Sequence, residues 1–186
     1  ALTWYAPPLE SATVVVLGGS GGTGSTGIQI AKALGAARVV ATTSAANVDY
    51  CRGIGADVVV DYKARNWTDV VADGSVDVVY DTVGQAGPPA DAALEKLRGP
   101  NASYVSIAGG APTARDPRAK QFINSDTNLD NVALLDALAA LVDAGKLRMS
   151  HIDSTYALGA LDAAFTRSAT GRVVGKVAVA IKDGSE

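Results

Sequence analysis

Short runs of branched apolar residues alternate with helix-forming segments along much of the chain, and this alternation constrains the fold more than any other feature. The runs predict buried strands at residues 13–17, 38–42, 58–61, 76–81 and 103–107. The Ala- and Leu-rich stretches between them predict helices at residues 23–34, 47–54, 67–72 and 89–97. Strands separated by helices call for parallel pairing through right-handed crossovers, with helices on both sheet faces. The sequence therefore predicts an α/β fold with a doubly wound parallel sheet.

The second half of the chain is less regular. Residues 109–131 are rich in Gly, Pro, Asp and Asn and predict a loop. Asn131 is placed to cap a helix through residue 144, with Gly145 as its stop. The apolar face of that helix is formed by Leu134, Leu135, Leu138 and Leu141. Further strands are predicted at residues 151–156 and 173–181, with a helix at 161–167 between them.

Composition excludes several classes of function. The 186 residues carry 16 basic and 19 acidic side chains, a net charge of −3, which gives no general attraction to nucleic acid. The single cysteine, Cys51, excludes an internal disulfide and a multi-thiolate zinc site, and we interpret it as a small buried apolar residue. No window approaches the ~20 apolar residues of a membrane-spanning helix. The first residue is Ala1, so a processed leader and a clipped start both stay open, within an intracellular location in the cytoplasm or an organelle.

A glycine-rich loop follows the first predicted strand directly and opens the first long helix. Gly19, Gly21 and Gly24 have the G-x-G-x-x-G spacing of a dinucleotide-binding turn. In such a turn the first glycine permits the sharp bend, the second lets a pyrophosphate approach the backbone, and the third lets the helix pack against the sheet. Amides at the helix start, around Gly22 and Thr23, would face the anion with the helix dipole behind them. A glycine-rich turn that binds nothing is the alternative.

The end of the second predicted strand decides between NAD and NADP. An NAD site places a carboxylate about 20 residues after the glycine loop, where it binds the ribose hydroxyls. This chain has Thr42, Thr43 and Ser44 there, so nothing at that corner repels a 2′-phosphate. We therefore predict NADP, although the next residues, 45–47, include no Lys or Arg. A flavin or nucleoside ligand in the same turn is a further alternative.

Several motifs together resemble the medium-chain dehydrogenase/reductase superfamily in its zinc-free quinone oxidoreductase-like branch. They are the glycine loop at residues 18–24, Ile-Gln-Ile-Ala-Lys at 28–32, Gly-Ala-Asp at 55–57, Asp-Tyr at 61–62, Tyr-Asp-Thr-Val-Gly at 80–84 and Gly-Arg-Val-Val-Gly-Lys-Val at 171–177. The resemblance covers most of the chain and implies a Rossmann-type domain that binds NADPH without a metal.

The resemblance also implies roles for individual residues. Gly21, Gly22, Thr23 and Gly24 would hold the pyrophosphate, and Ser44 would hold the 2′-phosphate. Tyr62 would lie beside the adenosine end, and Lys176 would contact the cofactor from near the chain end. The residues expected on the nicotinamide side are Val83, Gly84, Ile107 and Ala108.

Members of this superfamily begin with a substrate domain that the sequence lacks. Residues 1–12 then resemble a remnant of the helix that leaves that domain, residues 13–145 the dinucleotide-binding domain, and residues 146–186 a strand-helix-strand segment packing on it. A fragment, a split enzyme and a naturally reduced protein all stay open at this point.

The predicted function is an NADPH-dependent oxidoreductase that transfers hydride to a quinone or an α,β-unsaturated carbonyl, with this chain as its cofactor-binding portion. Such chemistry chiefly requires positioning and no metal, and the sequence offers no residue that we can name as its acid or base. The alternative is a non-catalytic scaffold or nucleotide-sensing subunit of a larger assembly. Expected partners are the small-molecule acceptor and either a second copy of the chain or a larger protein assembly.

Overall fold

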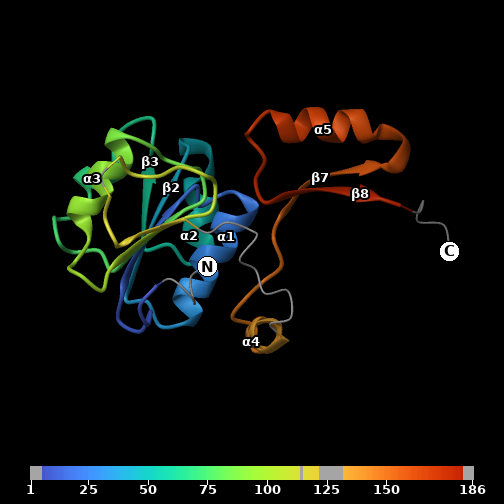
Figure 1. Cartoon of the computed structure of the whole chain (residues 1–186). Helices are drawn as coiled ribbons and strands as arrows, with labels where there is room; N and C mark the ends of the chain where they lie inside the picture. The colour runs from blue at the N-terminus through green and yellow to red at the C-terminus, as the bar shows by residue number, and fades with distance from the viewer. Residues whose placement is uncertain (1–5, 114, 122–131, 182–186) are drawn as a thin grey trace.

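A six-stranded parallel sheet forms the centre of the computed structural model, which describes residues 6–113, 115–121 and 132–181. Its strand order is β3-β2-β1-β4-β5-β6, the order of a doubly wound dinucleotide-binding fold, and the predicted fold class is confirmed (Figure 1). The strands are β1 (Thr13–Leu17), β2 (Arg38–Thr43), β3 (Val58–Asp61), β4 (Val78–Asp81), β5 (Ser103–Ser106) and β6 (Ala119–Gln121).

Strand β1 lies at the centre because its side chains are apolar on both faces. Val14 and Val16 belong to one buried cluster, whereas Val15 and Leu17 belong to the other. This division follows from the two-residue period of a strand, which sends successive side chains to opposite faces. A continuous apolar run is what a parallel strand covered on both sides requires.

Helices cover the two faces of the sheet. The first cluster is closed by α1 (Gly22–Ala33) and α2 (Val48–Gly53), which follows the short 3-10 turn η1 (Ala45–Asn47). The second is closed by α3 (Pro88–Lys96) and the 3-10 turn η2 (Trp67–Asp69). Cys51, a residue of α2, is fully buried, and burial raises its pKa to about 11, which confirms its interpretation as a small core residue.

The structure corrects two sequence predictions. The helix predicted at residues 67–72 is only the 3-10 turn η2, and the chain bends again at Gly74, whose φ is +64°. The predicted loop at 109–131 contains β6, whose Ala119 pairs with Tyr104 of β5. An edge strand of three residues has a single neighbour and needs no long apolar run, so the sequence pattern missed it. Asn131 lies outside the described residues, and α4 extends over Val132–Asp143.

The last part of the chain forms a separate two-stranded parallel sheet. It contains β7 (Ile152–Ala157), the 3-10 turn η4 (Leu158–Ala160), α5 (Leu161–Ala169) and β8 (Lys176–Ala180), and it stands beside the main sheet (Figure 1). A parallel bridge between Gly175 and Gly21 joins this unit to the turn after β1, and the Gly175 amide donates to the Ser20 carbonyl at 2.9 Å. The domain boundary at residue 145 stays a prediction. No helix in the described ranges is both long enough and apolar enough to cross a membrane.

A buried carboxylate fixes the loop that follows β4. Asp81 is fully buried, and its two oxygens accept hydrogen bonds from the amides of Val83, Gly84 and Gln85 at 2.7–2.9 Å. The hydroxyl of Tyr104 on β5 donates to the same carboxylate at 2.6 Å. A buried charge needs such partners, so Asp81 ties the β4 loop to the neighbouring strand.

Replacing Tyr104 with Phe should lower the free energy of unfolding by about 2 kcal/mol, because the Asp81 carboxylate loses one charge-assisted hydrogen bond in the core. Tyr80→Phe is the matched control: it removes a tyrosine hydroxyl from the adjacent strand, one with no hydrogen bond to any described residue, and should cost less than about 1 kcal/mol. Urea unfolding of both variants measures the difference. Equal losses would show that the Tyr104–Asp81 contact contributes nothing specific.

The same contact predicts how stability depends on pH. Burial, the hydrogen bond to Asp81 and the negative charge of Asp81 all raise the pKa of Tyr104. A tyrosine in an unfolded chain ionises at about pH 10. Above that pH, Tyr104 therefore loses its proton in the unfolded chain but keeps it in the folded protein. The free energy of unfolding should therefore fall as the pH rises above about 10. Urea midpoints measured up to pH 11 should decline less steeply for Tyr104→Phe than for the wild type.

Candidate functional site

The turn between β1 and α1 lies at the point where the strand order reverses, between β1 and β4. Ligands of doubly wound sheets bind in the crevice at such a switch point. The turn is held to β2 because the Gly18 amide donates to Thr42 Oγ1 at 3.0 Å and the Gly19 amide donates to the Thr42 carbonyl at 2.8 Å. Its position is therefore fixed by the sheet and does not depend on a ligand.

The glycines of this turn have different structural roles. Gly18 has a φ of +79°, so the sharp bend predicted at Gly19 falls one residue earlier. Gly19 is instead a packing position, where a Cβ would come within 3.0 Å of both Ala41 and Ile28. At Gly24 a Cβ would overlap the carbonyl oxygen of Gly18, which confirms that this glycine lets the helix approach the turn. Gly21 has no such steric reason, since a Cβ there would meet only the Gly18 carbonyl at 3.4 Å.

The start of α1 carries a positive electrostatic environment. The helix begins at Gly22 and has no acidic residue in its first turn. Its first amides, including that of the exposed Thr23, have no partner within the helix. The side chain of Lys176 on β8 lies directly against Gly22. It is so close that a Cβ on this glycine would overlap Lys176 Cε. An ammonium beside the positive end of a helix dipole favours an anion between the two.

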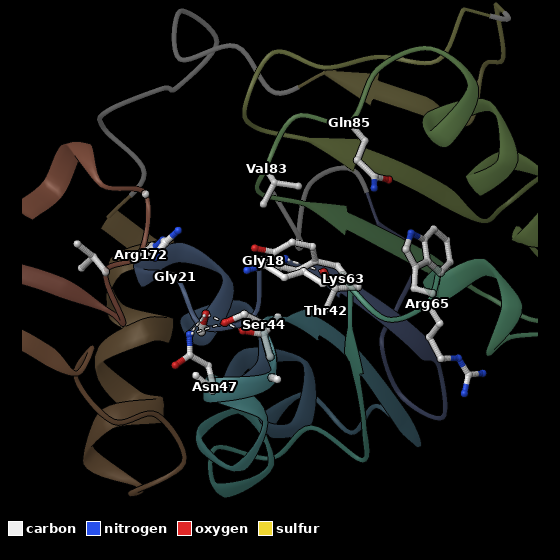
Figure 2. Close-up of a pocket in the computed structure, with 18 of the residues that line it drawn as sticks. Gly18, Gly21, Thr42, Ser44, Asn47, Lys63, Arg65, Val83, Gln85 and Arg172 are labelled. Carbon is white, nitrogen blue, oxygen red and sulfur yellow. Dashed lines mark hydrogen bonds between the residues drawn. The ribbon is translucent and has the colours of Figure 1, made fainter.

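A cavity of about 860 Å³ extends from this turn along the ends of β2 and β3 (Figure 2). Its volume falls within the range of small-molecule and cofactor sites. It joins the Gly18–Gly21 turn to the corner after β2, and Figure 2 shows Ser44 and Asn47 along one wall with Val83 and Gln85 along the other. Among the residues that the structure describes, its lining contains no carboxylate.

The corner after β2 presents a group of hydroxyls and one amide. Ser20 Oγ accepts hydrogen bonds from Thr43 Oγ1 at 2.8 Å and from Asn47 Nδ2 at 3.3 Å. Asn47 Nδ2 also lies 3.4 Å from Ser44 Oγ. Thr42 and Thr43 are buried, so Ser44 and Asn47 are the polar side chains of this corner that stay partly open to the cavity. The sequence predicted Ser44 for this wall, but not Asn47.

Three cations from distant parts of the chain line the same cavity. Lys63 and Arg65 come from the loop after β3, and Arg172 comes from the segment before β8. Within the described ranges none of the three side chains forms an ion pair. No Lys or Arg follows Ser44 directly in the sequence, and these three cavity cations were not predicted. Only the fold brings them together, although the Gly-Arg motif at 171–172 was already part of the resemblance.

The remaining predicted residues do not all meet in one place. Tyr62, which is 59% exposed, and Val83 both line the cavity, and Val83 lies against Gly18 on the wall opposite Ser44 (Figure 2). Gly84, with a φ of +78°, packs on the carbonyl of Ala108, and both stand outside the cavity lining. Ile107 is partly buried against the cluster beneath α1.

Comparison with known proteins agrees with this geometry. The family model described as zinc-binding dehydrogenase matches residues 54–179. A trans-enoyl reductase of Aspergillus terreus is 35% identical over 196 residues, covering 91% of this chain and 52% of the relative. A chloroplastic NADPH-dependent alkenal/one oxidoreductase of Arabidopsis thaliana is 29% identical, covering 90% of this chain and 40% of the relative.

The fold itself also has counterparts among solved structures. The quinone oxidoreductase of Coxiella burnetii superposes with a TM-score of 0.75 at 24% identity, over 93% of this chain and 54% of the other. The chain thus spans about half the length of the relatives it matches. Its motifs, its strand order and these matches show that it belongs to the zinc-binding dehydrogenase family, in the quinone and enone reductase-like branch of the medium-chain dehydrogenase/reductase superfamily.

Proposed function

We propose that the chain binds NADPH and acts as the cofactor-binding portion of an oxidoreductase that reduces a quinone or an α,β-unsaturated carbonyl. The observation that carries this proposal is the shape and charge of one cavity, which connects a glycine turn to a corner with hydroxyls, cations and no lining carboxylate among the described residues. The relatives support the same class, since one is named for enoyl reduction and another for NADPH-dependent reduction of alkenals and enones.

The residues present fit the diphosphate of the cofactor. Gly21 lines the cavity and leaves its Cα face open, as a closely approaching diphosphate needs. The amides of Gly22, Thr23 and Gly24 open α1, and Lys176 lies against Gly22. Each of these groups is a donor or a positive charge, and a bound anion would remove the repulsion between the Lys176 ammonium and the helix dipole.

The corner after β2 fits the 2′-phosphate that distinguishes NADPH from NADH. Ser44 and Asn47 offer a hydroxyl and an amide, and Arg172 and Lys63 offer positive charge from the facing loops. A guanidinium binds phosphate with two parallel hydrogen bonds, which makes Arg172 the stronger of the two cations for this task. Tyr62 and Trp67 then provide apolar surface for the adenine end of the nucleotide.

When bound, the nicotinamide ring would supply the hydride, and the contribution of the chain is to hold the nucleotide in place. We assign the nicotinamide side to Val83, Gly84, Ile107 and Ala108, which follow the carboxyl ends of β4 and β5. Asp81 fixes the backbone of this loop through three amides. Of this group, Val83 is the one that lines the cavity, on the wall opposite Ser44 (Figure 2).

The name of the family implies zinc, but the described residues do not fit a zinc site. Zinc in enzymes is commonly held by three protein ligands drawn from Cys, His and carboxylates. No group of three such side chains gathers anywhere in residues 6–113, 115–121 and 132–181. Cys51 is buried beneath the glycine turn, whereas His151 is exposed beside the ring of Tyr50. We therefore assign no step to a metal.

Titration of the chain with NADPH and NADH, followed by nucleotide fluorescence, tests the proposal directly. We expect saturable binding of NADPH that is at least about tenfold tighter than that of NADH, because the 2′-phosphate gains charge-assisted hydrogen bonds. The proposal is wrong if neither nucleotide binds. Tight binding with no turnover of a quinone or alkenal by the full-length protein would instead favour the nucleotide-sensing subunit.

Ser44→Asp should reverse the preference between the two nucleotides. The new carboxylate would bind the ribose hydroxyls of NADH and repel the 2′-phosphate of NADPH, weakening NADPH by about tenfold or more. Ser44→Asn is the matched control, because it has the same size as Asp and no charge. If both variants weaken NADPH equally, the loss comes from side-chain size and Ser44 does not face the phosphate.

A further inference from the structure

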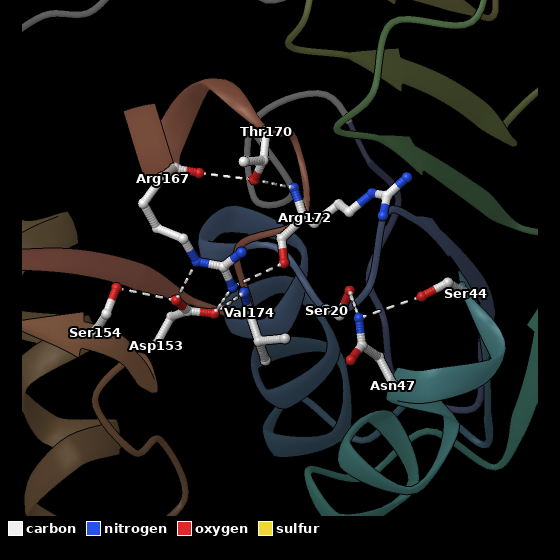
Figure 3. A network of polar contacts seen from close by, with 9 residues as sticks. All are labelled: Ser20, Ser44, Asn47, Asp153, Ser154, Arg167, Thr170, Arg172 and Val174. Carbon is white, nitrogen blue, oxygen red and sulfur yellow. Dashed lines mark hydrogen bonds and ion pairs between the residues drawn. The ribbon is translucent and has the colours of Figure 1, made fainter. Parts of the chain in front are cut away.

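One carboxylate in the C-terminal unit accepts hydrogen bonds from three residues. Asp153 on β7 accepts from Arg167 Nε at 2.7 Å, from Ser154 Oγ at 3.0 Å and from the backbone amide of Val174 at 3.1 Å (Figure 3). A second Arg167 nitrogen, Nη2, binds the other carboxylate oxygen, so the ion pair is bidentate. The side chain of Asp153 is only 10% exposed. Asp153 therefore links β7 to α5 and to the segment that leads into β8.

The same network holds the backbone of Arg172 at both of its polar groups. Arg167 Nη2 donates to the Arg172 carbonyl at 3.3 Å. The Arg172 amide donates to Thr170 Oγ1 at 3.2 Å, and that hydroxyl in turn donates to the Arg167 carbonyl at 2.7 Å. Arg172 thus lies in a short loop, residues 170–175. The end of α5 holds this loop at Thr170, and Asp153 and Ser20 hold its other end at Val174 and Gly175. Below we call this segment the Arg172 loop.

The Arg172 side chain leaves this network and enters the cavity. In Figure 3 its guanidinium points away from Arg167, over the side of the site where Ser20 and Ser44 lie. Within the described part of the chain it forms no ion pair. The two arginines therefore differ in role: Arg167 is ion-paired with Asp153, and Arg172 keeps its donors for another anion.

Apolar packing holds this unit only weakly, which leaves the polar network to fix the loop. Of the residues in α5 only Ala164 is buried, and Phe165 is 70% exposed. Neither β7 nor β8 has a fully buried residue. A unit with so little buried apolar surface gains little rigidity from its core. The position of the Arg172 loop therefore depends on its hydrogen bonds to Asp153 and to Ser20.

We infer that the Asp153–Arg167 ion pair is a positioning element for cofactor selection, which acts by holding Arg172 where it can bind the 2′-phosphate of NADPH. This inference rests on the proposed function. Neither Asp153 nor Arg167 lines the cavity, so neither touches the nucleotide directly. Their effect on binding passes through Arg172 and should be confined to the nucleotide that carries the extra phosphate. The hydrogen bonds from Arg167 hold the pKa of Asp153 well below its usual range, so the pair stays ionised at neutral pH.

The test is a double-mutant cycle on nucleotide affinity with four proteins: the wild type, Asp153→Asn, Arg172→Ala and the double variant. Arg172→Ala should weaken NADPH by about tenfold and NADH by less than about twofold, because only NADPH loses a phosphate contact. Asp153→Asn should weaken NADPH by about three- to fivefold and leave NADH unchanged. In the Arg172→Ala background, Asp153→Asn should have no further effect on NADPH.

Asp162→Asn is the matched control. It removes the same charge from the same unit, at an exposed position in the first turn of α5, outside the network. Its NADPH affinity should equal that of the wild type, which separates the ion pair from the general loss of a negative charge. Thermal melting of every variant reports whether the fold persists. If Asp153→Asn fails to fold, Arg167→Lys takes its place, because it keeps the charge and loses the bidentate contact.

Two results would overturn the inference alone. Equal weakening of NADPH and NADH by Asp153→Asn would show a general structural role, and an additive loss in the double variant would show that Asp153 does not act through Arg172. In both cases wild-type binding of NADPH would still stand, and so would the proposed function. Failure of the wild type to bind either nucleotide would remove the proposed function first, and the inference with it.

Discussion

The backbone contact between Gly18 and Gly24 is the constraint on which the rest of the site depends. Because no Cβ stands between the turn and the helix, α1 begins directly over the end of β1, and its first amides open at the switch point of the sheet. A side chain at Gly24 would overlap the Gly18 carbonyl and push the helix away from the strand. The amides would then no longer converge beside the cavity. The geometry of the site thus depends on the lack of a side chain at Gly24.

The site is completed by a segment far away in the sequence. The bridge between Gly21 and Gly175 brings β8 to the glycine turn, and with it Lys176 on one side and Arg172 on the other. Gly175 permits this approach, since its φ is +73° and a Cβ there would overlap the backbone of His151. The geometry of the turn and the cations around it therefore come from two parts of the chain that meet at the Gly21–Gly175 bridge. This explains how a weakly packed unit can still contribute to a defined site.

The sequence predicted the doubly wound core of the fold and only part of the candidate site. Strands such as β1 were predictable because both of their faces are buried, and a continuous valine run has few other structural uses. The role of Gly24 followed from its spacing after β1. Strand β6 was not predictable, because a short edge strand has one neighbour and no apolar signature. Lys63 and Arg172 were missed for another reason: their proximity to Ser44 depends on which strand ends are adjacent, and that information is absent from local patterns.

The charges around the cavity favour an anionic ligand. The chain as a whole is acidic, with a net charge of −3, yet the cavity lining combines three cations with no carboxylate among the described residues. Such separation is unfavourable for an empty cavity, because Lys176 and the α1 dipole repel each other and Arg172 has no anionic partner in the described chain. An anion bound between Lys176 and the start of α1 is attracted by both positive groups. Under the proposed function, a dinucleotide with a diphosphate and a 2′-phosphate would place its charges at the two positions where the fold concentrates positive charge, and Ser44 and Asn47 would then discriminate by hydrogen bonding at the second of them.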